Sequence, residues 1–275
     1  MGSLGSPAGA GGLRAGRWAV AMGRSSDAAA LGSAPRGRAV PRAFDSGARC
    51  YDRLVGANPG YHEHLRLSAR RMRLPDGGAG LRLLDAGCGT GASTGALLSV
   101  APDAEIVAVD ASEGMLARAR GKPWPPSVSF VRTGVEHLAE AGVRGPFDAV
   151  FAAYLVRNLD DPDSTLREFR SLLRPGGTLA VHEYSVRDSL RARVVWHAVC
   201  WSVIIPAGRL LGGDASLYRY LRRSVAAFDG ADRFRRRLRE AGFTAVHSET
   251  MTGWQRDVVH TFLADRPEGG REWTS

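Results

Sequence analysis

Short apolar segments alternate with segments of helical periodicity along most of this chain, beginning near residue 81. The apolar segments predict strands at residues 81–86, 105–110, 128–131, 147–154, 178–184, 244–249 and 258–263. Strands that alternate with helices form parallel sheets, because two parallel neighbours can be joined only by a long crossover connection. The sequence therefore predicts an α/β fold with a seven-stranded, mostly parallel sheet and flanking helices.

One crossover helix has clear boundaries in the sequence. Asp161 and Pro162 are typical of the first positions of a helix, and the Arg-Pro-Gly-Gly stretch at residues 174–177 is expected to end it. Between these boundaries the apolar residues fall on one helical face, as expected for a helix that packs on a sheet: Leu166, Phe169, Leu172 and Leu173. A second helix is predicted at residues 231–241, before Gly242.

Residues 1–43 differ in composition from the rest of the 275-residue chain. They are rich in Gly, Ala and Arg and lack any periodicity, which predicts a disordered extension before a domain at residues 44–265 and a flexible tail at 266–275. The first 43 residues also fit an organellar transit peptide, a myristoylated end, or a start codon placed too early, with Met22 as the true start.

The net charge of +9 invites a nucleic-acid interpretation, but the composition argues against it. Lys122 is the only lysine, which points to a coding bias toward arginine, and segregated basic patches with interleaved aromatics are missing. No nucleic-acid partner is therefore expected. The cysteines Cys50, Cys88 and Cys200 are far apart, so neither a disulfide framework nor a metal site is expected, and a cytoplasmic location follows.

The glycine-rich stretch LLDAGCGTGASTG at residues 83–95 fits three chemistries. It can be a dinucleotide-binding turn, a hydrolase nucleophile elbow at Ser93, or a loop that binds S-adenosylmethionine. The elbow is disfavoured, because residues 85–90 already make the sharp turn and Ser93 then lies in the first turn of the helix. Asp110, at the end of the second strand, can accept hydrogen bonds from the ribose hydroxyls of either nucleoside cofactor, so it does not distinguish between the two.

The loop itself favours S-adenosylmethionine over a dinucleotide. Asp85 lies two residues before Gly87, where its carboxylate is well placed to hold the amino group of a methionine moiety. A third glycine, Gly91, leaves a wide turn without a dedicated seat for a pyrophosphate. An NAD-binding oxidoreductase and a non-catalytic binding module stay open as alternatives.

From about Phe44 to Gly253 the chain resembles the class I methyltransferases of ubiquinone and menaquinone biosynthesis, which methylate a ring carbon of a polyprenylated quinol. The matching stretches are YDRL at Tyr51, LLDAGCGTG at Leu83, VAVDASEGML at Val107, YLVRNL at Tyr154, YRYLRRSV at Tyr218 and LREAGF at Leu238. The glycine loop is common to many methyltransferases, whereas YLVRNL followed by YRYLRRSV is more specific. The resemblance implies a Rossmann-like fold with a helical lid inserted after the fifth strand.

The resemblance also implies S-adenosyl-L-methionine as the cofactor and no metal. The expected cofactor-binding residues are Asp85, Gly87, Cys88, Gly89, Gly91, Asp110, Ala111, Met115, Gly134, Val135, Glu136 and Tyr154. One departure matters: Gly134 stands where the family usually has an acid or amide for the adenine amino group. The backbone around residues 134–136 is therefore expected to contribute more here.

Arg157, Asn158 and Tyr51 match family positions that face the methyl acceptor. Arg157 can stabilise a developing phenolate, and Asn158 can orient the ring or a water. The sequence does not select a general base among His137, His182 and a water held by Arg157.

The apolar run VVWHAVCWSVII at residues 194–205 would span about 18 Å as a helix, too short to cross a bilayer core of about 30 Å. One interpretation is a core helix. The other is an apolar wall for a prenyl tail, with peripheral membrane contact, which the resemblance implies because in that family the connection after the fifth strand helps to cover a lipid-tailed acceptor. The acceptor is thus expected to be a lipid-tailed aromatic molecule, and another aromatic or polyketide scaffold is the alternative.

Overall fold

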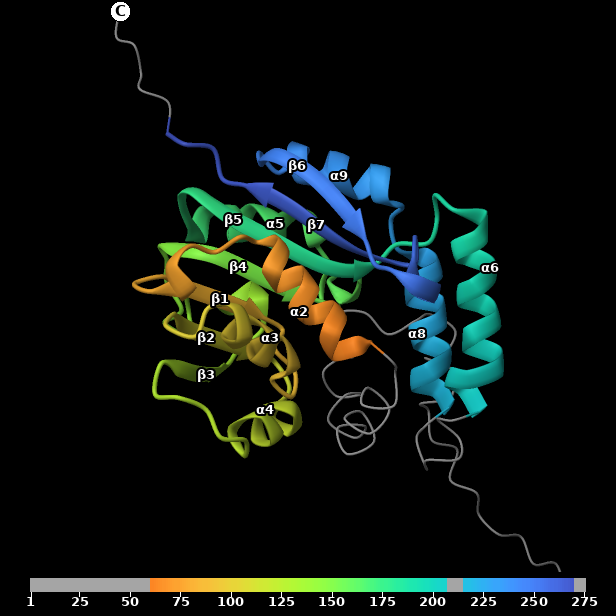
Figure 1. Ribbon diagram of the computed structural model, residues 1–275, viewed down its shortest axis with the longest axis horizontal. Helices are drawn as coiled ribbons and strands as arrows, with labels where there is room; N and C mark the ends of the chain where they lie inside the picture. Colours follow the sequence, from red (N-terminus) through yellow and green to blue (C-terminus); the bar gives the residue numbers. More distant parts are fainter. Residues whose placement is uncertain (1–59, 207–214, 270–275) are drawn as a thin grey trace, which may run out of the picture. The chain divides into compact units, whose positions relative to one another are not determined.

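The structure is a computed structural model that describes residues 60–206 and 215–269. It is built on one seven-stranded sheet of order β3-β2-β1-β4-β5-β7-β6 (Figure 1). The strands are β1 Arg82–Ala86, β2 Glu105–Asp110, β3 Val128–Arg132, β4 Phe147–Ala153, β5 Leu173–Tyr184, β6 Thr244–Thr250 and β7 Val259–Asp265. Strands β1 to β5 pair in parallel, and β7 runs antiparallel to both of its neighbours. The predicted fold class is confirmed.

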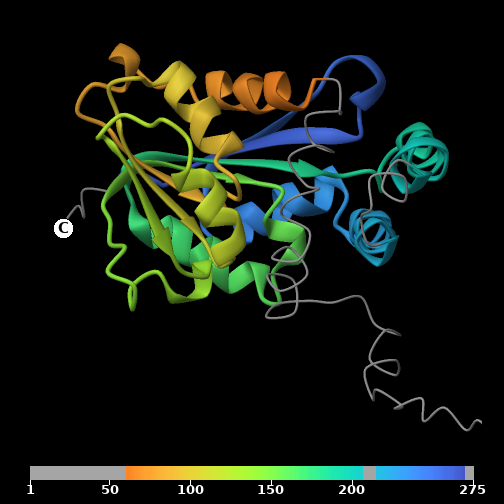
Figure 2. The ribbon, with the colours of Figure 1, turned by 90° about the horizontal axis from the view of Figure 1, so that it is seen from below.

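Helices cover both faces of the sheet, α2 and α3 on one and α5 and α9 on the other (Figure 2). The longer helices are α2 Tyr61–Arg71, α3 Ala92–Val100, α4 Glu113–Arg120, α5 Pro162–Leu172, α6 Leu190–Val199, α8 Ala215–Ala227 and α9 Ala231–Glu240. Leu83 and Leu84 are adjacent in β1 and point to opposite faces, yet neither is exposed. Burial on both faces explains why the strands read as continuous apolar runs.

Two predicted boundaries were wrong by a few residues. Leu173 was expected on the apolar face of the helix at α5, but it is the first residue of β5 and pairs with Phe147. The strand therefore starts before the Pro-Gly-Gly stretch, which lies within it as an irregularity in the register. The second boundary is the end of β4, which was predicted at Tyr154. The strand ends at Ala153, because Tyr154 takes the left-handed conformation with φ 55°.

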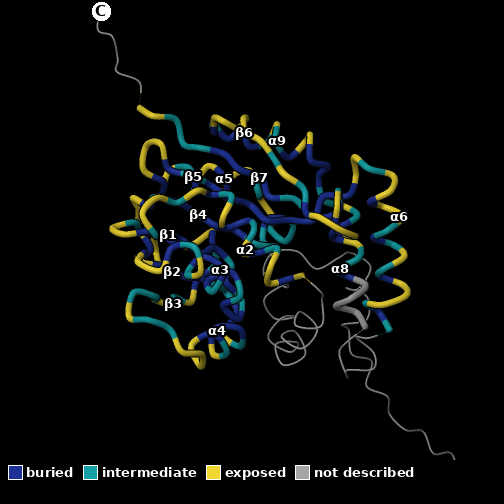
Figure 3. Tube along the Cα trace, in the orientation of Figure 1, coloured by how far each residue is buried: buried dark blue, intermediate teal, exposed yellow. Residues whose placement is uncertain are grey.

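A helical insertion follows β5, as predicted. It contains α6, the π-helical segment η5 Cys200–Ile204 and α8, which lie beyond the end of β5 (Figure 1). The buried side of α6 and η5 packs through Trp196 and Cys200 onto Tyr184 of β5. The opposite side is exposed (Figure 3), and its large apolar residues include Val194 and Trp201. The segment at residues 194–205 is therefore buried on one side and exposed on the other.

The predicted tail is anchored at its first residue. The Arg266 N–H donates to the Gly177 carbonyl, and its guanidinium donates to the carbonyls of Arg170, Ser171 and Leu173. Residues 1–59 and 270–275 lie outside the described residues, so the domain limits of 44 and 265 stay predictions. Within the described part of the chain, no helix has both the length and the apolar character needed to span a membrane.

Candidate active site

The glycine loop turns the chain from β1 into α3. Gly87, Gly89 and Gly91 all have positive φ, at 73°, 56° and 87°, a region that residues with a Cβ rarely adopt. The N–H groups of Gly87 and Cys88 donate to the Val109 carbonyl at 2.8 and 2.9 Å, which ties the loop to the end of β2. A side chain at Gly89 would meet nothing within 4 Å, so this part of the loop borders open space.

Asp85 is completely buried at the base of the loop. One carboxylate oxygen, Oδ2, accepts hydrogen bonds from Ser93 Oγ at 2.8 Å and Thr94 Oγ1 at 2.6 Å. The other oxygen, Oδ1, is buried with no hydrogen-bond partner among the described residues. Burial raises the pKa of Asp85 to about 7. A buried acceptor without a donor fits a ligand that brings a cationic amino group to this position, as the sequence predicted.

Asp110 ends β2 and fixes the loop from the other side. Its Oδ2 accepts from the Gly89 N–H and its Oδ1 from the Ser112 N–H, both at 2.8 Å. Ser112 in turn caps α4 by accepting from the Met115 N–H. Asp110 therefore has a structural role in shaping the loop, beside the ribose contact that the sequence predicts. Ala111, between these two residues, is half-buried.

The predicted adenine region lies at η3, Val135–His137. Val135 is buried in the core, whereas Glu136 is exposed. A Cβ placed on Gly134 would lie 2.7 Å from the carboxyl carbon of Glu136, so the Glu136 side chain folds back over the glycine. A carboxylate is thus present beside residue 134, although the sequence has none at that position.

The Cys88 side chain does not face the loop opening. It is buried in a small cluster with Ala108 and Leu116, and burial raises the pKa of its thiol well above the usual value. The thiol therefore packs as an apolar group, and Cys88 can serve a ligand only through its backbone.

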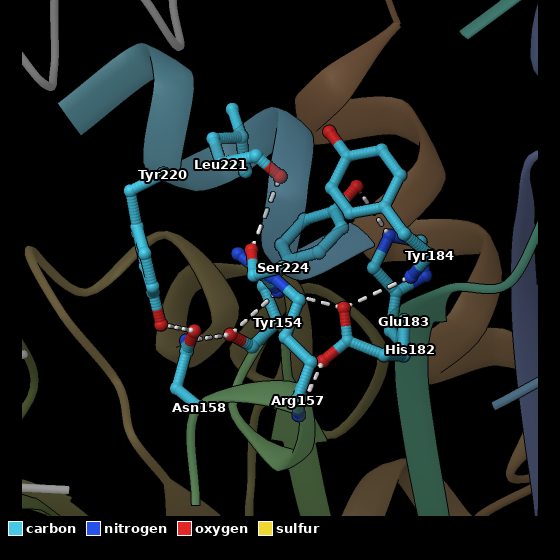
Figure 4. A network of polar contacts seen from close by, with 9 residues as sticks. All are labelled: Tyr154, Arg157, Asn158, His182, Glu183, Tyr184, Tyr220, Leu221 and Ser224. Carbon is cyan, nitrogen blue, oxygen red and sulfur yellow. Dashed lines mark hydrogen bonds and ion pairs between the residues drawn. The ribbon is translucent and has the colours of Figure 1, made fainter. Parts of the chain in front are cut away.

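Arg157 and Asn158 lie on the 3-10 turn η4 Val156–Asn158, directly after β4, in a network of buried polar contacts (Figure 4). Arg157 Nη1 donates to Glu183 Oε1 at 2.6 Å and to the Tyr154 carbonyl at 2.8 Å. Asn158 Nδ2 donates to the same carbonyl at 3.0 Å, and its Oδ1 accepts from the Tyr220 hydroxyl at 2.8 Å. Tyr220 belongs to α8, so the network joins the sheet edge to the helical insertion.

Glu183 is a site residue that the sequence analysis missed. It is completely buried at the end of β5, and its ion pair with Arg157 joins two residues 26 positions apart in the chain. Burial raises the pKa of Glu183, and Arg157 offsets only part of that shift. The buried Arg157 keeps one donor, Nε, with no partner in the described part of the protein. The one sequence signal for this residue was an acidic side chain within a strand that is otherwise mostly apolar, at His182-Glu183-Tyr184.

The histidines named as possible bases have different surroundings. His137 is about half exposed, and its Nδ1 lies 3.1 Å from Glu140 Oε2. His182 is completely buried in β5, and burial lowers its pKa to about 3. Its Nε2 contacts the Tyr154 hydroxyl at 2.9 Å, and its Nδ1 contacts Ser68 Oγ at 2.7 Å. Tyr51 lies outside the described residues, so its predicted place at the acceptor stays a prediction.

Comparisons with known proteins agree with this geometry. The model of the ubiE/COQ5 methyltransferase family matches residues 34–261. The demethylmenaquinone methyltransferase of Clavibacter sepedonicus is 32% identical over 215 residues, which cover 78% of this chain and 85% of that protein. The ubiquinone/menaquinone biosynthesis C-methyltransferase UbiE of Bradyrhizobium diazoefficiens is 33% identical over 184 residues, covering 65% and 72%.

A solved structure shares the fold. It is Haemonchus contortus phosphoethanolamine N-methyltransferase 2 in complex with S-adenosyl-L-methionine, with a TM-score of 0.56 and 19% identity, covering 82% of this chain and 57% of that one. The family match extends over most of the sequence and includes the glycine loop with its buried Asp85. The chain therefore belongs to the ubiE/COQ5 methyltransferase family and is an S-adenosylmethionine-dependent methyltransferase.

Proposed function

We propose that this enzyme transfers a methyl group to a ring carbon of a prenylated quinol, of the kind named for its demethylmenaquinone methyltransferase relatives. The observation that carries this proposal is the buried Arg157 guanidinium at the end of β4. It is adjacent in sequence and structure to the strand ends where such folds bind ligands, and it retains an N–H donor. A cation with an N–H group that has no partner among the described residues suits a methyl acceptor that develops negative charge on its oxygen.

The cofactor supplies a methyl group activated on a sulfonium, and the residues around the glycine loop would hold it. The Asp85 carboxylate would accept from its amino group through Oδ1. Asp110, which ends β2 beside the glycine loop, would accept hydrogen bonds from the ribose hydroxyls. Glu136, folded over Gly134, would supply the acceptor for the adenine amino group.

The acceptor must lose a phenolic proton before its ring carbon becomes a strong nucleophile. The bound cofactor would supply the methyl group to this carbon and keep the electron pair of the broken bond on its sulfur, and the ring carbon would pass its proton to water as the aromatic ring is restored. Arg157 would stabilise the phenolate and Asn158 would orient the ring. His182 is disfavoured as the general base, because both of its nitrogens are hydrogen-bonded and burial keeps its pKa near 3.

The lipid tail would lie along the insertion formed by α6 and η5. Leu190, Val194 and Trp201 are 69%, 60% and 59% exposed, which is unusual for large apolar side chains on one short segment. Arg191 and Arg193 are exposed on the same helix. Apolar side chains flanked by arginines suit peripheral contact with an anionic lipid surface, where a prenylated acceptor resides.

An assay of methyl transfer tests the reaction. The wild-type enzyme should methylate a reduced demethylmenaquinone analogue in preference to catechol or RNA. Arg157→Lys should lower turnover by about tenfold or more, because lysine keeps the charge but loses the planar fork that Glu183 and the Tyr154 carbonyl position. S-adenosylhomocysteine affinity should change little. Preference for a tail-less catechol or polyketide would instead support the alternative class of acceptor.

The role of the insertion is tested with acceptors of different tail length. Trp201→Asp should depress turnover on a prenylated acceptor more than on a tail-less ring, and should weaken sedimentation with phosphatidylglycerol vesicles. Trp254→Asp is the control, because Trp254 is also exposed but lies on η6 Gly253–Gln255, outside the insertion. Equal losses on both acceptors would argue that this face serves only stability.

A further inference from the structure

A continuous chain of side-chain hydrogen bonds runs from Arg71, the last residue of α2, to Tyr154. Arg71 Nη1 donates to Thr261 Oγ1 at 2.8 Å, and Thr261 Oγ1 lies 2.6 Å from Ser68 Oγ. Ser68 Oγ contacts His182 Nδ1 at 2.7 Å, and His182 Nε2 contacts the Tyr154 hydroxyl at 2.9 Å. Ser68, Thr261 and His182 have no exposed surface. We call these five residues the Arg71–Tyr154 chain.

The first member of the chain fixes its direction. Arginine can only donate hydrogen bonds, so Thr261 must accept from Arg71. The Thr261 hydroxyl proton then goes to Ser68, whose own proton goes to His182 Nδ1. A neutral imidazole that accepts at Nδ1 carries its proton on Nε2, and that proton is donated to the Tyr154 oxygen.

The opposite direction is less favourable. It would have Tyr154 donate to His182, His182 donate to Ser68, and Ser68 donate to Thr261. Thr261 would then accept from both Ser68 and Arg71, and the contacts of the described residues offer its own proton no acceptor other than Ser68. A buried hydroxyl proton without an acceptor is unfavourable, because the hydroxyl has lost its hydrogen bond to water and gains none in the protein. Burial also lowers the pKa of His182 to about 3, so the ring is neutral. A neutral ring donates at one nitrogen and accepts at the other, whereas a protonated ring would donate at both.

Tyr154 lies where such a donor can serve a ligand. It is half-buried at the carboxyl end of β4, and its neighbour Leu155 lies 3.0 Å from where a Cβ on Gly87 would be. The Arg157 guanidinium lies 5.6 Å from the centre of the Tyr154 ring. Tyr154 has a positive φ of 55°, which is unfavourable for an aromatic residue, and such conformations concentrate at functional sites.

We propose that Tyr154 donates its hydroxyl proton as a hydrogen bond to the ring oxygen of the methyl acceptor, and that the Arg71–Tyr154 chain holds Tyr154 in this donor orientation. This inference rests on the proposed function and assigns Tyr154 to the acceptor in addition to the cofactor side predicted from the sequence. His182 acts through Tyr154 and is a positioning residue. A donor at the ring oxygen stabilises the phenolate and so lowers the pKa of the bound acceptor.

The direction of the chain can be measured without any substrate. Nitrogen-15 NMR of histidine-labelled enzyme should show a neutral His182 with its proton on Nε2. Thr261→Val keeps the shape of the side chain but removes the link to Arg71, and should weaken this tautomer preference. A proton on Nδ1 in the wild-type enzyme would overturn the proposal, whatever the enzyme methylates.

The role at the acceptor is measured by the pH dependence of turnover. Tyr154→Phe should move the apparent pKa for acceptor ionisation upward by about one unit, so that turnover falls about tenfold at pH 7 and recovers at high pH. S-adenosylhomocysteine affinity should be retained. Tyr61→Phe is the control, because it removes a hydroxyl from the ring stacked on Tyr154 at 5.7 Å but not from the chain.

Two outcomes separate this inference from the proposed function. A wild-type enzyme that binds S-adenosylhomocysteine but methylates no quinol would contradict the proposed function and leave the tautomer result standing. A wild-type enzyme that methylates the quinol, with an unshifted pH profile in Tyr154→Phe, would contradict only the role of Tyr154. His182→Gln keeps an acceptor and a donor and should preserve the wild-type profile more closely than His182→Leu.

Discussion

Two carboxylates of the candidate active site, Asp85 and Glu183, have no exposed surface, but their surroundings differ. Asp85 accepts only from two hydroxyl groups and keeps one oxygen without a partner, so its ionised form is poorly stabilised in the absence of a ligand. Glu183 pairs directly with a guanidinium and accepts from the N–H groups of Arg157 and Tyr184. The two groups should therefore respond differently to pH and to substitution.

Asp85 should make the stability of the ligand-free protein fall as the pH rises from about 4 to about 7. Its pKa is raised from 3.8 to about 7, so in this window the folded state binds more protons than the unfolded state. The full effect is on the order of 4 kcal/mol. Urea denaturation at several pH values should show this slope in the wild type and lose it in Asp85→Asn. The exposed Asp103→Asn is the control and should keep it.

The affinity for S-adenosylhomocysteine should show the opposite trend with pH. The ionised form of Asp85 pairs best with a cationic amino group, so affinity should rise as the pH increases through about 7. Calorimetry in buffers of different ionisation enthalpy should detect a proton released on binding near neutral pH. A pH-independent affinity in the wild type would contradict the assignment of Asp85 to the amino group.

The Arg157–Glu183 pair should show strong coupling in stability. Arg157→Met leaves the buried Glu183 without its partner and should cost about 3–5 kcal/mol. Adding Glu183→Gln to that variant removes the buried charge and should recover much of the loss, as measured by denaturation of the single and double variants. The exposed pair of Arg120 and Glu113 is the control and should contribute at most about 1 kcal/mol.

At the scale of elements, local signals set where α5 begins, and tertiary pairing sets where it ends. Asp161 is the N-cap, and its carboxylate accepts from the Ser164 N–H at 3.0 Å, as the Asp-Pro pair predicted. The end of the helix was misplaced by one residue, because Leu173 has an extended backbone and pairs with Phe147 in the sheet. Helix ends that meet a sheet edge depend on partners far away in the sequence.

The cap of α5 can be tested by substitution. Asp161→Ala should lower the stability by about 1 kcal/mol, which for a domain of this size corresponds to a melting temperature lower by roughly 2–4 °C. Asp160→Ala is the matched control, because Asp160 is exposed and immediately precedes the cap. Equal shifts in the two variants would show that surface charge, and not the cap, accounts for the change.

At the scale of the whole molecule, the sheet, its covering helices and the described part of the candidate active site come from residues 60–269. The first 43 residues are predicted from composition to be a disordered extension, and they lie outside the described residues. A variant that begins at residue 44 should keep the melting temperature and the S-adenosylhomocysteine affinity of the full chain. A lower melting temperature in that variant would mean that the extension contributes to the folded domain.

The sequence by itself determined the strand count, the fold class, the glycine loop with Asp85 and Asp110, and the family. These features are encoded locally, by apolar periodicity, turn glycines and short motifs, so they can be recognised without a structure. Only the tertiary structure brought Glu183 to Arg157, folded Glu136 over Gly134, and aligned Arg71, Thr261, Ser68 and His182 behind Tyr154. Residues 68 and 261 are 193 positions apart, and no periodicity predicts their contact, because it follows from strand order and from α2 packing across the sheet.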